Sequence, residues 1–200
     1  MQTLIVATHN QHKVSEIETV LQAAGLPPLK LCSAAEAGCT EEPAETGLTF
    51  QENAEIKARY IKARCPEAWV LADDSGLCVN ALQGRPGIYS ARYAGDVPYP
   101  EKFRQLEREL AASGSSDRQA AFVCVMVLIS PAGQLFVSQG QVAGVIAPQA
   151  QGSNGFGYDP IFYLPQYNLT MAELDPAVKK RISHRAHALE GIISCLRDRL

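Results

Sequence analysis

The sequence has no long apolar run and no excess of basic charge. Nowhere does it reach the roughly 18 consecutive apolar residues of a membrane-spanning helix, and the apolar run at residues 4–7 is too short for a secretory signal and lacks a basic flank. We therefore expect a cytoplasmic protein with no membrane partner. The formal net charge of -3 argues against a nucleic-acid polymer as the main ligand, because binding a phosphate backbone requires a basic surface.

Common metal and nucleotide signatures are also missing. The six cysteines are scattered, with no C-x-x-C pair and no short zinc spacing, which favours free thiols in a reducing compartment. No G-x-x-x-x-G-K-[ST] segment occurs. The glycine-rich segment at 152–160 is not a dinucleotide fingerprint either, because Pro160 stands where the third glycine of G-x-G-x-x-G belongs.

The length and composition favour one domain over residues 1–200, with room for two lobes. A chain of 200 residues with 46% hydrophobic content can bury one substantial core. Apolar spacing predicts strands at 3–7, 69–72, 77–82, 120–130 and 134–147, and helices at 14–24, 49–64, from 100 onward and from about 183 onward. Residues 29–43 predict a loop or a weak edge strand.

Two adjacent carboxylates, Asp73 and Asp74, end the apolar run at 69–72 and are followed by Ser75 and a glycine. Acids at the carboxyl end of a buried strand lie where open α/β sheets bind ligands. Successive side chains of a strand point to opposite faces, so one acid can face a cation or a water while the other bonds to the scaffold. A turn with solvated acids is the alternative.

The polar loop from Thr8 to Lys13 joins the first strand to the first helix. Backbone N–H groups at a helix amino terminus, with a lysine alongside, suit a phosphate, although an ordinary connector is the alternative. The next helix begins with a capping box in which Thr49 and Glu52 satisfy each other's free N–H groups. Glu45 precedes this helix and Lys57 lies two turns into it, so an acid and a base can border Asp74.

The last third of the chain contains a glycine-rich loop with two aromatic residues and a cluster of basic residues. Phe156 and Tyr158 could stack on a flat ring, unless they are core aromatics of a flexible turn. His184 and Arg185 fall in the first turn of the last helix, where the helix dipole disfavours cations, which suggests that an anionic ligand offsets them. A solvated basic helix face is the alternative.

Six segments occur together in a distinctive order. They are T-H-N-x-x-K, E-T-G-L-T-F-x-E-N-A, A-D-D-S-G-L, P-G-I-Y-S-A-R-Y, N-G-F-G-Y-D-P-I-F and I-S-H-R-A-x-A-L. In this combination the chain strongly resembles the non-standard purine nucleoside triphosphate pyrophosphatases, also called the dITP/XTP pyrophosphatase or inosine triphosphatase family. The resemblance runs from Thr3 to the last helix. The sequence departs from the family pattern at His9, where many relatives have glycine, and this difference affects the geometry of the loop at residues 8–13.

The resemblance implies hydrolysis of ITP, dITP and XTP to the monophosphate and pyrophosphate, with Mg²⁺ as cofactor. It also implies an α/β fold with an elongated mixed central β-sheet flanked by helices, two lobes around a substrate cleft, and a homodimer. Asp74 would be the general base and, with Glu45, a metal ligand, although Glu41 and Glu42 leave that acidic position open. The implied substrate-binding residues are Thr8, His9, Asn10, Gln11, His12, Lys13, Lys57, Ser75, Phe156, Gly157, Tyr158, Asp159, Lys179, His184 and Arg185.

Physical chemistry agrees with this implied activity. A triphosphate carries about four negative charges near neutral pH, so its cleavage requires cationic neutralisation and a positioned water. A buried donor such as Arg185 or a loop N–H would favour the O6 acceptor of an oxopurine over the amino group of adenine.

Three alternatives remain: a nucleotide sensor without turnover, a related pyrophosphatase for modified pyrimidine or methylated guanine triphosphates, and a protein-interaction domain.

Overall fold

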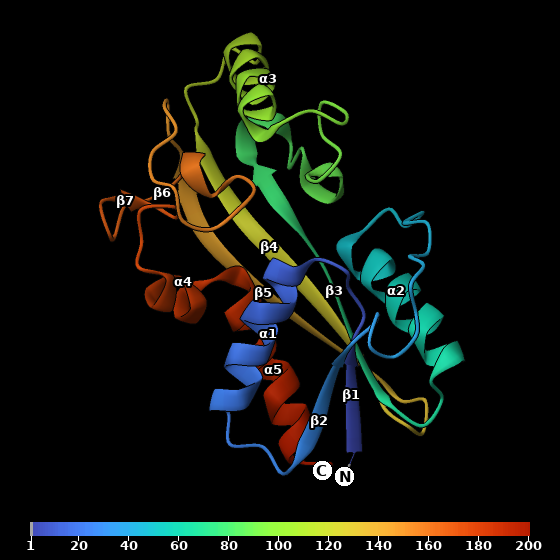
Figure 1. Cartoon of the computed structure of the whole chain (residues 1–200). Helices are drawn as coiled ribbons and strands as arrows, with labels where there is room; N and C mark the ends of the chain where they lie inside the picture. The colour runs from blue at the N-terminus through green and yellow to red at the C-terminus, as the bar shows by residue number, and fades with distance from the viewer. Residues whose placement is uncertain (1) are drawn as a thin grey trace. The chain divides into compact units, whose positions relative to one another are not determined.

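The computed structural model describes residues 2–200, and its strands form one mixed seven-stranded sheet in the order β2-β1-β3-β4-β5-β6-β7 (Figure 1). The strand β1 pairs in parallel with both β2 and β3, whereas β6 pairs antiparallel with β5 and β7. The α/β class with a mixed sheet is therefore confirmed. The strands are β1 (Gln2–Val6), β2 (Leu29–Ser33), β3 (Trp69–Val79), β4 (Gln119–Ile129), β5 (Leu135–Ile146), β6 (Phe162–Leu164) and β7 (Leu169–Thr170).

The five α-helices of residues 2–200 are α1 (Gln11–Ala23), α2 (Phe50–Arg64), α3 (Tyr99–Ala112), α4 (Pro176–Ile182) and α5 (His184–Arg197). Four of these five α-helices correspond to predicted ones, and α4 was not predicted. The capping box of α2 is present, with Thr49 Oγ1 accepting from the Glu52 N–H at 3.1 Å. Among the helices of residues 2–200, none has the length and apolar character required to cross a bilayer.

The chain forms two compact units, which we describe separately. Unit 1 contains the chain up to Asp74, Cys124–Gly140 and His184–Leu200, and unit 2 contains Ser75–Val123 and Gln141–Ser183. The strands β3, β4 and β5 contribute residues to both units. The single pyrophosphatase domain over residues 1–200 and its substrate cleft stay predictions.

In unit 1, helices cover both faces of the sheet. The apolar side chains of β1 and β3 alternate between the two faces, as the period of two requires. One set packs with α1 and α5, which lie side by side in Figure 1, and the other set packs with α2. The first set includes Leu4, Val6, Trp69 and Leu71; the second includes Ile5, Val70 and Ala72.

Unit 2 has its own core, built on the amphipathic helix α3. Leu106 and Leu110 of this helix are buried among strand residues such as Leu77 and Val79. The cluster also contains Tyr158 and Ile161, which anchors the segment after β5.

Two boundaries differ from the predictions. The helix α1 begins at Gln11 rather than at residue 14, because Asn10 caps it by accepting hydrogen bonds from the N–H groups of His12 and Lys13. Residues 69–79 form one continuous strand, not two strands with a break at the acids. The prediction of a strand end was wrong because the backbone stays extended through Asp73 and Asp74 while their polar side chains find buried partners.

Candidate active site

The two acids of β3 point to opposite faces of the sheet. Asp73 continues the series of Trp69 and Leu71, which face α1 and α5, whereas Asp74 continues the series of Val70 and Ala72, which face α2. Pairing with β1 stops at Leu71, opposite Val6, so both acids lie just beyond the carboxyl end of β1. The acids therefore occupy the edge expected for ligand binding, although β3 itself continues past them.

Asp73 is a scaffold carboxylate surrounded by cations. Its residue is 1% exposed, and its Oδ2 lies 2.8 Å from Lys13 Nζ and 3.6 Å from Arg185 Nε. Burial alone would raise the pKa of Asp73, but Lys13 and Arg185 outweigh burial, and the pKa is lowered. Arg185 in turn forms an ion pair with Glu16 of α1.

This pairing changes the expectation for the start of α5. Arg185 is 1% exposed, and the carboxylates of Glu16 and Asp73 offset its charge. Burial opposes the charged form, yet Asp73 and Glu16 raise the pKa of Arg185. Carboxylates of this chain therefore compensate the cation at this helix position, so Arg185 gives no indication of an anionic ligand. The alternative of a solvated basic face is wrong for Arg185, because this residue is buried. Its neighbour His184 is also buried.

Asp74 lies in a different environment, against α2. Its Oδ2 accepts a hydrogen bond from Asn53 Nδ2 at 3.2 Å, and its Oδ1 lies 3.7 Å from Lys57 Nζ. Burial raises the pKa of Asp74, Lys57 opposes the rise, and Glu45 adds to it, leaving the pKa raised. A carboxylate with a raised pKa is better suited to accept a proton than one such as Asp73.

Lys57 connects Asp74 to Glu45. The Lys57 ammonium lies 2.8 Å from Glu45 Oε1, so one cation bridges the two carboxylates. Burial lowers the pKa of Lys57, but Asp73, Asp74 and Glu45 together raise it above its usual value. The other two acids of this segment face elsewhere: Glu41 accepts from the Tyr60 hydroxyl, and Glu42 bonds to His9. Glu45 is thus the acid that shares a cation with Asp74.

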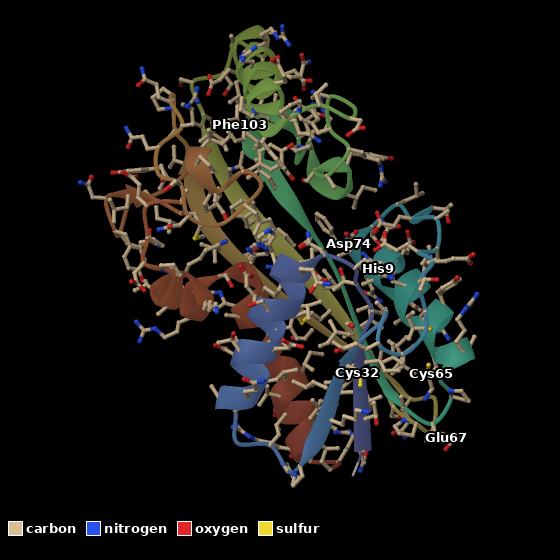
Figure 2. The ribbon with its side chains drawn as sticks, viewed as in Figure 1. His9, Cys32, Cys65, Glu67, Asp74 and Phe103 are labelled. Atoms are coloured by element: carbon tan, nitrogen blue, oxygen red, sulfur yellow. The ribbon has the colours of Figure 1, made fainter. Side chains whose placement is uncertain are left out.

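The predicted triphosphate loop, residues 8–13, follows β1 in unit 1. Thr8 Oγ1 accepts from the Asn10 N–H, and Asn10 caps α1, so Gln11, His12 and Lys13 belong to the first helical turn. Figure 2 labels His9 in this loop and Asp74 on β3. His9 Nδ1 lies 2.8 Å from Glu42 Oε1, and this hydrogen bond, with one to the Cys39 carbonyl, raises the pKa of His9.

Unit 2 positions the predicted nucleoside-binding residues of the glycine-rich loop. Asp159 Oδ2 accepts from the Phe156 N–H at 2.7 Å and from Lys179 Nζ at 2.6 Å. The Lys179 ammonium also lies 4.7 Å from the centre of the Phe156 ring. Gly155 has a φ of +78°, and a Cβ there would collide with the Asp159 carboxylate, which explains why glycine is required at this position.

The ring of Tyr158 does not serve as an open stacking surface. It is 3% exposed, meets Tyr99 edge-to-face with ring centres 5.3 Å apart, and donates its hydroxyl to the Ser90 carbonyl at 3.0 Å. The stacking role expected of Tyr158 was therefore wrong, because its ring belongs to the core of unit 2. Phe156 is half-buried, and Gly157 has a φ of +67° that favours glycine. Ser75, on β3, is also half-buried.

Sequence reasoning missed two buried residues of unit 1 that bond to predicted site residues. Asn53 and Glu16 are buried at 0% and 8% exposure, and they bond to Asp74 and Arg185 respectively. The inward positions of both residues on amphipathic helices could have singled them out, since a buried polar side chain requires a partner.

Comparison with known proteins covers almost the whole chain. The model of the Ham1 family matches residues 4–195. The chain belongs to the Ham1 family. Ham1 proteins of known structure share the fold: that from Coxiella burnetii is 39% identical with a TM-score of 0.90, covering 99% of this chain and 100% of that one. The Ham1 protein from Staphylococcus aureus is 38% identical with a TM-score of 0.87, covering 100% of both chains.

Curated Ham1 relatives carry an enzyme name. The dITP/XTP pyrophosphatase of Haemophilus influenzae is 45% identical over 200 residues, covering 98% of this chain and 99% of the relative. That of Leuconostoc mesenteroides is 43% identical over 189 residues, covering 94% of each. The predicted family is thereby confirmed, and the roles of individual site residues stay predictions.

Proposed function

We propose that this Ham1 protein hydrolyses the triphosphates of non-standard purine nucleosides, ITP, dITP and XTP, to the monophosphate and pyrophosphate. The observation that carries the proposal is the separation of the two acids of β3. Asp73 is neutralised by Lys13 and Arg185, whereas Asp74, on the other face, has a raised pKa beside Lys57 and Glu45. Full-length relatives named dITP/XTP pyrophosphatase support the substrate class.

In this proposal Asp74 is the general base. It would accept a proton from a water aligned with the α phosphorus, because cleavage between the α and β phosphates yields the monophosphate and pyrophosphate. Lys57 and Lys13 are the cations of unit 1 that would neutralise the phosphates, with Thr8 and Asn10 contributing polar groups of the loop. In unit 2, Lys179 would serve with Phe156 and Asp159 on the nucleoside.

The donors around Asp74 fit a magnesium ion. Glu45 and Asp74 offer carboxylate oxygens, the ligands that Mg²⁺ prefers, and the position between them already attracts a cation, the Lys57 ammonium. Within residues 2–200, no group of three or more histidine, cysteine, aspartate or glutamate side chains is arranged to hold a metal. In this proposal Mg²⁺ would be held by the two carboxylates together with water and substrate phosphates, and it would neutralise phosphate charge.

Base selection follows from the O6 atom of inosine and xanthine. A donor facing O6 would favour these bases, since adenine would leave buried polar groups unpaired at a cost of about 1 to 3 kcal/mol each. The N–H groups of the glycine-rich loop are the proposed donors, because Arg185 is 1% exposed and its guanidinium already faces Glu16 and Asp73. The homodimer also belongs to this proposal, and size-exclusion chromatography with light scattering tests it. The cytoplasmic location stays a prediction.

A pyrophosphate-release assay across ITP, dITP, XTP, GTP and ATP, with Mg²⁺ and with chelator, tests the function. We expect turnover of the first three substrates only, and none with chelator. Equal rates on GTP and ITP would contradict the specificity, and indifference to chelator would contradict the metal.

The role of Asp74 is tested by Asp74→Asn, with Asp198→Asn as a control that removes one exposed carboxylate. We expect Asp74→Asn to abolish pyrophosphate release while calorimetry still detects binding of ITP. Near-normal turnover by Asp74→Asn would exclude Asp74 as the base. Binding of ITP by the wild-type protein without turnover would instead support the nucleotide sensor.

A further inference from the structure

Asn53 is a fully buried amide that holds two segments of unit 1 at once. Its residue is 0% exposed. Its Nδ2 donates to Asp74 Oδ2 at 3.2 Å, and its Oδ1 accepts from the Gly47 N–H at 2.8 Å. The two partners assign the amide without ambiguity, because a backbone N–H can face only the oxygen and the carboxylate can face only the nitrogen.

Gly47 comes close enough to Asn53 only because it has no side chain. A Cβ at Gly47 would lie 2.7 Å from Asn53 Oδ1 and 2.6 Å from Glu52 Cβ. Glu52 Oε2 reinforces the contact by accepting from the N–H groups of Leu48 at 2.6 Å and Thr49 at 3.1 Å. These hydrogen bonds therefore hold the segment that follows Glu45 against the first turn of α2.

Asn53 and Lys57 lie one helical turn apart on α2, so their side chains share one face. From that face Asn53 donates a hydrogen bond to Asp74 Oδ2, and the Lys57 ammonium lies between Asp74 Oδ1 and Glu45 Oε1. The amide thus holds the Asp74 carboxylate in an orientation in which its other oxygen lies toward Lys57.

We propose that Asn53 is a positioning residue for the reaction. Its amide fixes the position of Asp74 relative to the Gly47 backbone, so that Asp74 Oδ1 and the Glu45 carboxylate face the same cation site. The inference rests on the proposed function, since it takes Asp74 as the reacting carboxylate. Asn53 itself touches no substrate and acts through Asp74.

Two substitutions and one control test this role in turnover of ITP. Asn53→Ser is too short to reach both partners, and Asn53→Asp keeps the acceptor for Gly47 but loses the donor to Asp74. Ala58→Gly weakens the same helix at a buried apolar position of the cluster that contains Val70 and Ala72. We expect both Asn53 variants to lose about 10- to 100-fold in kcat, as for a lost hydrogen bond to a charged group, with KM changed less than about threefold.

Comparison with Ala58→Gly separates positioning from folding. We expect Ala58→Gly to lower the melting temperature measurably while keeping kcat within about twofold of the wild type. If the kcat of Asn53→Ser falls no further than that of Ala58→Gly, Asn53 is a structural residue only and the inference is overturned.

A second measurement requires no turnover. The side-chain NH₂ signals of Asn53 in a ¹⁵N–¹H spectrum report its bond to Asp74 directly. We expect Asp74→Ala to speed hydrogen exchange of this NH₂ group at least about tenfold, and Asp198→Asn to leave it unchanged. An unchanged exchange rate in Asp74→Ala would overturn the inference. If the wild-type protein releases no pyrophosphate from any nucleotide, the proposed function fails, and the NH₂ exchange alone decides whether Asn53 holds Asp74.

Discussion

Replacing Asp73 by asparagine tests how much this carboxylate contributes to the free energy of unfolding. The change keeps the size of the side chain and removes the charge that faces Lys13 at 2.8 Å and Arg185 at 3.6 Å. The side chains of Asp73 and Arg185 are 0% and 2% exposed, so water cannot replace the lost charge. Glu16 remains as a partner of Arg185, but Lys13 has no second ion pair within 4.0 Å among the described carboxylates of unit 1.

The expected loss is large for one substitution. Removing one partner of a buried ion pair costs about 3–5 kcal/mol, and the remaining amide oxygen of asparagine places the value near the lower end, about 3 kcal/mol. With a urea dependence of about 2–3 kcal/mol per M, the unfolding midpoint should fall by about 1–1.5 M. Urea unfolding followed by circular dichroism measures it, with Asp198→Asn as a surface control expected to stay within about 0.5 kcal/mol.

The pH dependence adds an independent check. The pKa of Asp73 is lowered in the folded protein, because Lys13 and Arg185 outweigh the effect of burial. Its contribution to stability is therefore fully present above its unfolded pKa of about 3.9 and is lost as the pH falls through the folded value. The difference between wild type and Asp73→Asn should be constant from about pH 5 to 8 and shrink below about pH 4. A loss under about 1 kcal/mol at pH 7, as for an exposed salt bridge, would refute the reasoning.

Three further outcomes are expected. Gly47→Ala places a Cβ 2.6 Å from Glu52 Cβ and should destabilise the protein by about 1–3 kcal/mol in thermal unfolding, so an unchanged melting temperature would contradict the close approach. Tyr158→Phe removes the buried hydrogen bond to the Ser90 carbonyl and should cost about 1–2 kcal/mol, whereas Tyr163→Phe, which loses an exposed bond, should cost less than about 0.5 kcal/mol; equal losses would argue against the buried bond. Glu42→Gln should lower the pKa of His9, measured by NMR titration of its ring, and an unmoved titration would show that Glu42 does not raise it.

Features with partners close in sequence were predicted well. The capping box joins Thr49 and Glu52, three residues apart, so its residue types are a sufficient signal. The turn between β4 and β5 is equally local, with the Ser130 N–H donating to the Gln134 carbonyl at 2.9 Å. By contrast, β6 and β7 have only 3 and 2 residues, too few for their apolar pattern to stand out, and they were not predicted.

The sequence by itself determined that Asp73 and Asp74 would point apart on an extended backbone, because a strand repeats every two residues. Only the tertiary structure decided what each acid meets. Arg185 and Glu16 pair across 169 residues, and Asn53 reaches Asp74 across 21, since the sheet brings α1 and α5 to one face and α2 to the other. Such long-range pairs depend on strand order and helix packing, which no local pattern of residues records. These pairs make Asp73 a scaffold carboxylate and its neighbour Asp74 the candidate base.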